Sequence, residues 1–327
     1  MKAVTIQFAD KGALAIAEVA TPATGSRDIK IRVQAAALNR ADLLQRKGLY
    51  PAPAGIPTDI PGLECAGEVC EVGSQVTRFK AGDRVMALMG GAAQAEYVVC
   101  EEDCAALVPP GMSLVEAAAI PEAFITAYDA LLHQGRFSLG DTVLIHAAGS
   151  GVGTAAVQLA QVAGAAAIYG TASAAKHEQL RQLGLTVGID YRSEEFASAI
   201  LAKQPQGVDL VLDFVGGGYW QQNVKCLKSQ GRLVLIGFLG TPKLPAETSL
   251  APLLQKRIEV VGTVLRSRSR AEKALLVQAL ADKLLPLFVS GRLKAIIART
   301  FPFGEVEQAY RYLETNQNFG KVVLAWE

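Results

Sequence analysis

Residues 146–153 carry the residue types of a phosphate-binding loop: three glycines and mostly small side chains follow a single histidine. The apolar stretch Thr142–Ile145 before them predicts a strand, and the amphipathic stretch that opens at Thr154 predicts a helix. A helix start presents unpaired backbone N–H groups and a partial positive charge, and small residues let a pyrophosphate approach them closely. This segment therefore predicts a dinucleotide-binding site.

The loop departs from the strict pattern G-x-G-x-x-G. If Gly153 is the third glycine, at which helix and strand pack closely, Ala148 and Ser150 fill the first and second positions. A plain glycine-rich turn between a strand and a helix stays open as an alternative for this segment alone. The surrounding residues decide between the two.

The next apolar stretch, Ala165–Tyr169, predicts a strand that ends at Gly170 and Thr171. A fold that binds NAD places an acidic residue at about this point to hold the ribose, and this sequence has none there. The hydroxyls of Thr171 and Ser173 and the cation of Lys176 suit a 2′-phosphate, which a carboxylate would repel. The stretch therefore predicts NADPH as the cofactor, and a polar loop with Ser173 as a helix N-cap is compatible with it.

Composition argues against several classes of partner. The 327 residues include 32 Lys and Arg against 31 Asp and Glu, so no overall field favours nucleic acid or an anionic membrane. No run of about 18 apolar residues predicts a membrane span. The alternating start Met1–Phe8 predicts a strand rather than a signal peptide. We therefore expect a soluble, cytoplasmic protein of two domains that binds a small molecule and no membrane; binding to nucleic acid would need a local cationic patch.

The cysteines and histidines predict no metal site. Five cysteines at irregular spacing in a chain of this length indicate reduced thiols. Cys100 and Cys104 form a C-x-x-x-C pair, but the second pair that a structural zinc site needs is missing. His133, His146 and His177 have no cysteine or carboxylate at metal-ligand spacing, and His146 is interpreted as a strand-end residue.

Two patterns divide the chain. Up to about Ile120, short β-like runs are broken by Gly and Pro, which predicts an irregular, largely antiparallel β domain. These runs are Ile29–Gln34, Ala66–Val72, Asp83–Leu88 and Ala95–Val99. From about Pro121, helices alternate with apolar strands, which predicts right-handed crossovers and a doubly wound parallel sheet. The predicted strands are Thr142–His146, Ala165–Tyr169, Val187–Asp190, Val208–Val215, Leu233–Ile236 and Glu259–Leu265.

The end of the chain has mixed character: a strand at Ala295–Arg299, a helix at Glu305–Leu313 and a strand at Lys321–Leu324. We expect it to return to the first domain. Residues 1–120 and 293–327 then form one domain and residues 121–292 the other, with the cofactor in a cleft between them. The predicted fold class is α/β.

Six segments, in order over nearly the whole chain, resemble the medium-chain dehydrogenase/reductase superfamily, and more narrowly its zinc-independent NADPH:quinone reductase branch, the zeta-crystallin relatives. They are Ala37–Leu43, Pro61–Glu64, Gly82–Val85, Pro121–Tyr128, His146–Leu159 and Asn318–Leu324. Arg40, Gly218–Trp220 and Leu265–Arg268 are most similar to the tumour-suppressor-inducible quinone oxidoreductase type. The resemblance implies a GroES-like β-rich catalytic domain and a Rossmann domain, in a homodimer joined through sheet edges of the cofactor domain.

Zinc-dependent members of this superfamily carry three ligands in the catalytic cleft, and the corresponding positions here are Asn39, Leu63 and Glu122. Leu63 has no lone pair to donate, so the resemblance implies a reductase without catalytic zinc. Asn39 and Tyr50 are then the candidates for polarising a substrate carbonyl near the nicotinamide. A cap or turn role for Asn39 and packing on prolines for Tyr50 stay open. The resemblance also directs Arg266 toward the nicotinamide cleft.

The remaining cofactor contacts are implied by position in the family. Thr126 would lie near the carboxamide, with a hydroxyl bonded inside its own helix as the alternative. Lys176 could instead be a solvated helix charge, and Gly320 could serve only to turn the chain. The full set of implied contacts is Thr126, Ser150, Gly151, Val152, Gly153, Thr171, Ser173, Lys176, Tyr191, Val215, Gly216, Gly237, Phe238, Leu239, Gly320 and Lys321.

The predicted function is the transfer of hydride or electrons from NADPH to a quinone, with the protein supplying orientation, exclusion of water and oxyanion stabilisation. Reduction of the double bond of enals or enones stays open; it needs a proton donor, for which Tyr50 is the candidate. A nucleotide-dependent RNA-binding or structural protein with little catalysis also stays open, through the three arginines of residues 266–270. The alternative for that run is a solvated loop with Ser269 as N-cap.

Overall fold

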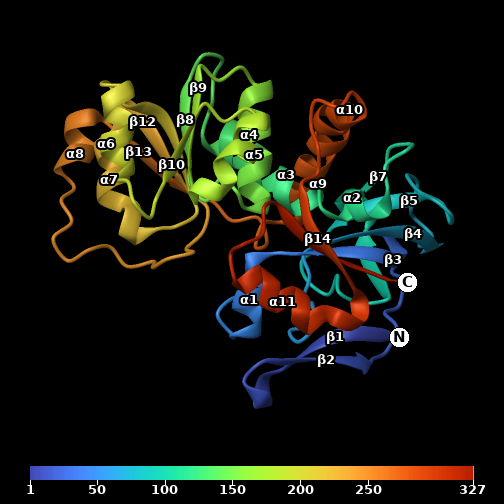
Figure 1. Cartoon of the computed structure of the whole chain (residues 1–327). Coiled ribbons are helices and arrows are strands. Elements are labelled where there is room, and N and C mark those ends of the chain that lie inside the picture. The colour runs from blue at the N-terminus through green and yellow to red at the C-terminus, as the bar shows by residue number, and fades with distance from the viewer. Residues whose placement is uncertain (327) are drawn as a thin grey trace. The chain divides into compact units, whose positions relative to one another are not determined.

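The computed structural model describes residues 1–326, and the chain divides into two compact units. The first unit comprises Met1–Ile125 and the chain from Leu265 onward; the second comprises Thr126–Val264. The end of the chain thus returns to the unit in which it began (Figure 1).

The first unit is built on a seven-stranded sheet of order β14-β15-β3-β4-β5-β7, with β6 paired to β3, and on a hairpin of β1 and β2. Every pair is antiparallel except β14 with β15. The strands are β1 Lys2–Gln7, β2 Ala13–Glu18, β3 Asp28–Leu38, β4 Glu64–Val72, β5 Arg84–Leu88, β6 Tyr97–Glu101, β7 Ala105–Leu107, β14 Ile297–Pro302 and β15 Lys321–Ala325. This architecture confirms the predicted, largely antiparallel β domain.

The helices of this unit are short. They are α1 Arg40–Arg46, α2 Leu114–Ala118, α3 Pro121–Tyr128, α9 Arg270–Ala279, α10 Leu285–Val289 and α11 Val306–Glu314, with the π-helical turn η6 Leu280–Leu284 and the 3-10 turns η1 Phe8–Asp10, η2 Glu102–Cys104 and η7 Phe303–Glu305. The amphipathic helix α11 packs on β14 and β15 (Figure 1). The boundary between the units falls inside α3.

Strand β3 is the centre of the first unit, because β15, β4 and β6 all pair with it. Ile29, Ile31 and Val33 point into one hydrophobic core, as the alternation of a strand requires. From Ala35 to Leu38 every residue is buried. This buried end of β3 leads directly into Asn39, so the first predicted catalytic residue follows the most enclosed part of the sheet.

The second unit contains a six-stranded sheet of order β10-β9-β8-β11-β12-β13 in which every pair is parallel (Figure 1). This confirms the predicted Rossmann sheet. The order reverses between β8 and β11, and ligands of such sheets bind outside the carboxyl ends of the strands at this switch point. The strands are β8 Thr142–Ile145, β9 Ala167–Ala172, β10 Val187–Asp190, β11 Val208–Asp213, β12 Leu227–Leu235 and β13 Glu259–Gly262.

Helices sandwich this sheet. They are α4 Gly151–Val162, α5 His177–Gln182, α6 Phe196–Lys203, α7 Trp220–Cys226 and α8 Ala251–Lys256, with the π-helical turn η3 Asp129–Gln134 and the 3-10 turns η4 Ala174–Lys176 and η5 Gly217–Tyr219. Leu144 packs into a core with Phe196 of α6 and Val224 of α7. Val143 and Ile145 alternate to the opposite face, and α4 packs on β8 and β9.

Several element boundaries differ from the predicted ones. Strand β9 includes Gly170 and Thr171, at which it was expected to end, and continues to Ala172, and β13 ends at Gly262 instead of Leu265. Helix α4 starts at Gly151, three residues before the predicted start. These differences matter most at β9, because they move Thr171 from a loop into a strand.

The predicted domain boundary at residue 292 also differs from the unit boundary, which lies at Leu265. Helix α9 packs on β7 and η2 of the first unit. Arg270 at its start forms ion pairs with Glu101 and Asp103 of that unit. These contacts hold residues 265–292 in the first unit, where the helical pattern of the sequence had assigned them to the second.

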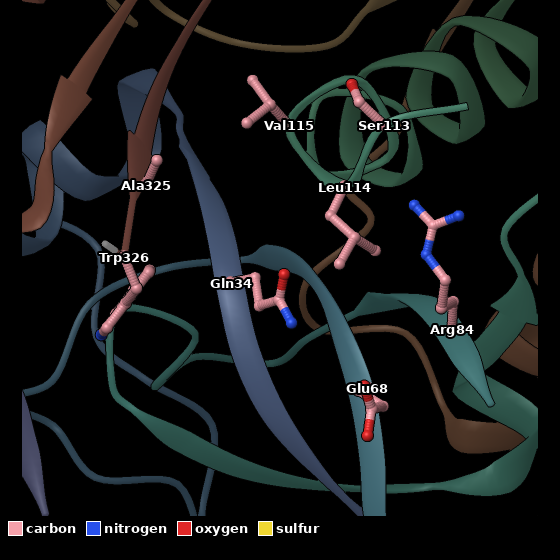
Figure 2. A pocket seen from close by; sticks show the side chains of 8 residues that line it. All are labelled: Gln34, Glu68, Arg84, Ser113, Leu114, Val115, Ala325 and Trp326. Carbon is pink, nitrogen blue, oxygen red and sulfur yellow. The ribbon is translucent and has the colours of Figure 1, made fainter. Parts of the chain in front are cut away.

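A hollow of about 390 Å³ opens on the first unit, as Figure 2 shows. Its lining residues are Gln34, Glu68, Arg84, Ser113, Leu114, Val115, Ala325 and Trp326. None of the side chains predicted to bind cofactor or acceptor is among them, so this hollow is not the candidate site. Among residues 1–326, no helix is both long and apolar enough to cross a bilayer.

Candidate active site

The predicted phosphate loop ends in a capped helix. Ser150 is the N-cap of α4: its backbone is extended, and its hydroxyl accepts a hydrogen bond from the N–H of Gly153 at 3.0 Å. Gly151 and Val152 lie in the first helical turn, where backbone N–H groups have no acceptor within the helix. The residues expected to meet a pyrophosphate therefore stand at a helix start.

The close packing around this loop explains its departure from the glycine pattern. A side chain at Gly153 would collide with the backbone of Ala147 and Ala148, as expected for the third glycine. Ala148 is fully buried at the first position, and Gly170 on β9 leaves the space that its methyl group needs. A glycine on the neighbouring strand thus substitutes for one in the loop.

Thr171 does not face a 2′-phosphate as predicted. It lies within β9 and is 1% exposed, with its hydroxyl 3.0 Å from Nδ1 of His146. The same oxygen accepts a hydrogen bond from the N–H of Ala147 at 3.3 Å. The Thr171 hydroxyl therefore already bonds to groups of the second unit. The sequence placed Thr171 at the strand end because β9 continues beyond its apolar residues.

Two cations, Lys176 and Arg192, follow the ends of β9 and β10. Burial and the neighbouring guanidinium of Arg192 lower the pKa of Lys176. Arg192 also lies over the ring of Tyr191, 5.7 Å from its centroid, and Tyr191 is 45% exposed. Ser173 occupies the N-cap position of η4 without a capping bond from its side chain. Arg192 is a candidate that sequence reasoning missed, although its place after a strand end marked it.

The turn after β11 is held by one carboxylate. Asp213 accepts hydrogen bonds from the N–H groups of Val215 at 2.6 Å and Gly216 at 3.0 Å. Gly216 has φ +94°, and a side chain there would collide with Phe238 and Thr241. The other residues predicted here are half-buried or half-exposed: Thr126 on α3, and Gly237, Phe238 and Leu239 after β12.

In the first unit, Lys321 is buried among oxygen atoms. Its ammonium donates to the carbonyl oxygen of Leu38 at 2.9 Å, to Oδ1 of Asn39 at 2.6 Å and to Oε1 of Glu64 at 2.6 Å. An ammonium has three donors, so all of them are used. The prediction that Lys321 contacts the cofactor is therefore corrected, because its ammonium forms an ion pair with Glu64. Gly320 before it has φ +87° and turns the chain into β15.

Asn39 is committed to the same cluster. Its Nδ2 donates to Oε1 of Glu64 at 3.0 Å and to the carbonyl oxygen of Ala37 at 3.3 Å. It is also the N-cap residue of α1, and its backbone N–H donates to the carboxylate of Asp42 at 2.7 Å. The structure thus favours the cap role that the sequence left open, since the amide that was to polarise a substrate already has protein partners.

Arg266 positions the segment that carries Tyr50. Its guanidinium donates to the carbonyl oxygens of Gly90 at 2.8 Å and Tyr50 at 3.0 Å, and to Oε1 of Gln45 at 2.8 Å. It also lies over the Tyr50 ring, 5.0 Å from its centroid. Arg266 is 4% exposed, so it acts on Tyr50 rather than on a ligand in solution.

The rest of the arginine run is held by the first unit. Ser269 is the N-cap of α9 and forms a reciprocal capping box with Glu272, which confirms the predicted N-cap, whereas Arg266 is buried rather than solvated. Arg270 bonds Oδ2 of Asp103 at 3.0 Å. Arg266 and Arg270 therefore both bond protein groups, which weighs against the alternative of RNA binding through this run.

Comparison with known proteins identifies the family. Residues 25–127 match the alcohol dehydrogenase GroES-like domain, and residues 151–281 match the zinc-binding dehydrogenase family. The chain is 36% identical over 327 residues to the human synaptic vesicle membrane protein VAT-1 homolog, covering 96% of this chain and 83% of that protein. It is 32% identical over 305 residues to the quinone oxidoreductase-like protein 2 homolog of Nematostella vectensis, covering 92% and 82%.

This chain is a quinone oxidoreductase-like member of the medium-chain dehydrogenase/reductase superfamily. Solved structures of this superfamily match it over its whole length. The CurK enoyl reductase has a TM-score of 0.88 at 31% identity, covering 100% of this chain and 99% of that one. An NAD-dependent alcohol dehydrogenase has a TM-score of 0.86 at 27% identity, covering 99% of each. The family resemblance seen in the motifs is confirmed.

The residues at the zinc positions of this superfamily do not fit zinc here. Leu63 is 1% exposed and offers no lone pair. Oδ1 of Asn39 and Oε1 of Glu64 already accept hydrogen bonds from Lys321, whose positive charge would repel a cation. Within residues 1–326, no group of three or more His, Cys, Asp or Glu is arranged to hold a metal ion.

Glu122 occupies a position at which the resemblance places a ligand in zinc-dependent members of the superfamily. Its backbone N–H donates to Oε2 of Glu64 at 2.8 Å. Burial and the neighbouring Glu64 carboxylate raise the pKa of Glu122 to about 8. Burial likewise raises the pKa of Asp42 to about 6 and that of Tyr50 to about 12. Sequence reasoning assigned Glu122 only a vacant zinc position, because nothing in the sequence places Glu64 beside it.

We expect Glu122→Gln to flatten the dependence of stability on pH. The folded protein keeps a proton on Glu122 that the unfolded chain releases near pH 4.5, so stability falls as pH rises from about 4.5 to 8. One such group contributes a slope of at most about 1.4 kcal/mol per pH unit. Urea unfolding at pH 5, 7 and 9 measures it. Glu247→Gln, in an exposed loop, is the control, and equal slopes in the wild type and Glu122→Gln would contradict the assignment.

Proposed function

We propose that this protein transfers hydride from NADPH to a quinone without a metal. The proposal rests on what we call the dinucleotide seat of the second unit. It consists of the capped, glycine-rich start of α4 beside the parallel sheet and of the neighbouring cations Lys176 and Arg192. The similarity to a quinone oxidoreductase-like protein supports the acceptor class. Bound NADPH supplies the hydride; with one proton, the quinone becomes a hydroquinone and NADP⁺ remains.

The protein's own groups have separate tasks in this reaction. Backbone N–H groups at the start of α4 bind pyrophosphate, and Lys176 and Arg192 bind the 2′-phosphate. A quinone oxygen that gains negative charge needs a hydrogen-bond donor, and we assign this to Tyr50, whose raised pKa of about 12 keeps the phenol protonated. If Tyr50 gives its proton to the quinone, neutral Glu122, with a pKa of about 8, is the source of the proton that replaces it.

Replacing Tyr50 should slow turnover more than it weakens cofactor binding. In an anaerobic assay with NADPH and phenanthrenequinone, we expect Tyr50→Phe to lower kcat about tenfold or more, with the KM for NADPH within about twofold, because the lost donor acts on developing charge. Tyr97→Phe, a partly buried tyrosine on β6, is the control. An unchanged kcat would remove Tyr50 from the mechanism, and no turnover of any quinone would overturn the function itself.

Replacing the two cations should remove discrimination between NADPH and NADH. We expect Lys176→Ala with Arg192→Ala to weaken NADPH binding about tenfold or more and to leave NADH binding nearly unchanged, because only NADPH carries a 2′-phosphate. Fluorescence titration with both cofactors measures this. Lys203→Ala, an exposed lysine at the end of α6, is the control. Equal wild-type affinity for the two cofactors would contradict the assignment.

Reduction of activated double bonds is the second candidate. The similarity to the CurK enoyl reductase supports it, as does a carboxylic acid at Glu122 that could protonate the carbon next to the carbonyl. It uses the same hydride as quinone reduction. Turnover of an enone and of a quinone under identical conditions ranks the two acceptors.

We further propose a homodimer joined at the edge of the parallel sheet. Within residues 1–326, strand β13 pairs only with β12, which leaves its other edge open, and Val260 on it is 37% exposed. Sedimentation velocity should show a dimer that Val260→Lys weakens, because charge opposes pairing between edges. Leu139→Lys, at a site 84% exposed before β8, should leave it intact. A monomeric wild type would exclude the dimer.

A further inference from the structure

A chain of hydrogen bonds between side chains crosses the carboxyl ends of three neighbouring strands in the second unit. It begins at Thr171 on β9, whose hydroxyl lies 3.0 Å from Nδ1 of His146 after β8. Nε2 of His146 lies 2.7 Å from Oδ1 of Asn223 on α7. Nδ2 of Asn223 donates to Oδ2 of Asp213, the last residue of β11, at 2.9 Å. All four side chains are at most 1% exposed.

The direction of every bond in this chain follows from its far end. A carboxylate only accepts, so Asn223 turns its Nδ2 toward Asp213 and its Oδ1 toward His146. Nε2 of His146 must then carry the proton, and Nδ1 must accept the hydroxyl proton of Thr171. The hydroxyl oxygen is left to accept the N–H of Ala147. Each donor therefore has one acceptor, and His146 is held as one neutral tautomer.

Both ends of this series of hydrogen bonds lie at turns of unusual backbone conformation. Ala147 has φ +47°, a left-handed conformation that residues with a side chain rarely adopt. At the other end, Asp213 binds the N–H groups of Val215 and of Gly216, which has φ +94°. The first turn opens the phosphate loop and the second lies beside it at the switch point of the sheet.

The environment of His146 keeps its ring fixed and neutral. Phe196 and Tyr219 contact it edge to face, with ring centroids 4.7 and 4.8 Å away. Burial lowers the pKa of His146. The side chain is 0% exposed, so it has no surface to offer to a cofactor or an acceptor.

We propose that His146 is a positioning residue of the dinucleotide seat: by bonding Thr171 on one side and Asn223 on the other, it fixes the strained turn at Ala147 relative to the turn at Val215 and Gly216. This inference rests on the proposed function in one respect, namely that the seat takes a dinucleotide. It adds that the strength of cofactor binding depends on a residue that the cofactor does not touch.

Two substitutions cut the chain of bonds on opposite sides of the ring. His146→Gln can keep the donor toward Asn223 and loses the acceptor for Thr171; His146→Asn does the reverse. We expect each to raise the Kd for NADPH about tenfold, as for one lost buried hydrogen bond, and to leave kcat at saturating NADPH within about twofold.

The matched control lies at the other end of the same strands. Thr142 at the start of β8 donates its hydroxyl to Asp209 of β11 at 2.7 Å. Thr142→Val removes a hydrogen bond between the same two strands, so it should lower Tm comparably and leave Kd unchanged. His146 variants that are folded and bind NADPH as tightly as the wild type would overturn the inference, as would an equal rise in Kd for Thr142→Val.

A second variant covers the case in which the ring substitutions fail to fold. Thr171→Val is nearly isosteric and removes one link of the chain, so it should raise the Kd and speed hydrogen exchange of residues 147–150 while sparing residues 187–190 of β10. Unchanged exchange at residues 147–150 would overturn the inference. A wild type that binds neither NADPH nor NADH would instead overturn the proposed function, so the two failures are distinguishable.

Discussion

The first unit depends on one buried charge pair, between Lys321 and Glu64. Both side chains are at most 5% exposed, and either ion left alone in such a place would destabilise the fold by about 3–5 kcal/mol. The ammonium joins β15 to the end of β3 and to the start of β4, while the other carboxylate oxygen accepts the N–H of Glu122 at the start of α3. One ionic contact thus unites the C-terminal strand with the elements that carry Asn39 and Glu122.

The same pair affects a neighbouring acid. Burial and the nearby Glu64, which is paired with Lys321, raise the pKa of Glu122 to about 8. At neutral pH Glu122 therefore keeps its proton beside a buried ion pair.

The fold could be predicted from the sequence more completely than the site. Alternation of apolar strands with helices, together with the loop at residues 146–153, was sufficient for the parallel sheet, because crossover rules leave few arrangements. Strand ends were less predictable: β9 continues through Gly170 and Thr171, which lack the apolar character used to trace it. The side chains of Thr171 and Lys321 carried the right chemistry for a ligand, but only tertiary structure shows that protein groups already use it. The roles proposed for Arg192 and Glu122 likewise depend on neighbours, Lys176 and Glu64, that are distant from them in the sequence.

The phosphate loop shows why a glycine pattern is better understood as a requirement for space and strain than for glycine itself. Ala148 is tolerated because Gly170 on the next strand leaves room for its methyl group. Ala147 is tolerated in a left-handed conformation because Thr171 binds its N–H, and such strain persists only where the surroundings determine it. At Gly153, backbone atoms of its own loop are in the way of a side chain. A relative in which residue 170 carries a side chain should therefore need glycine at the position of Ala148.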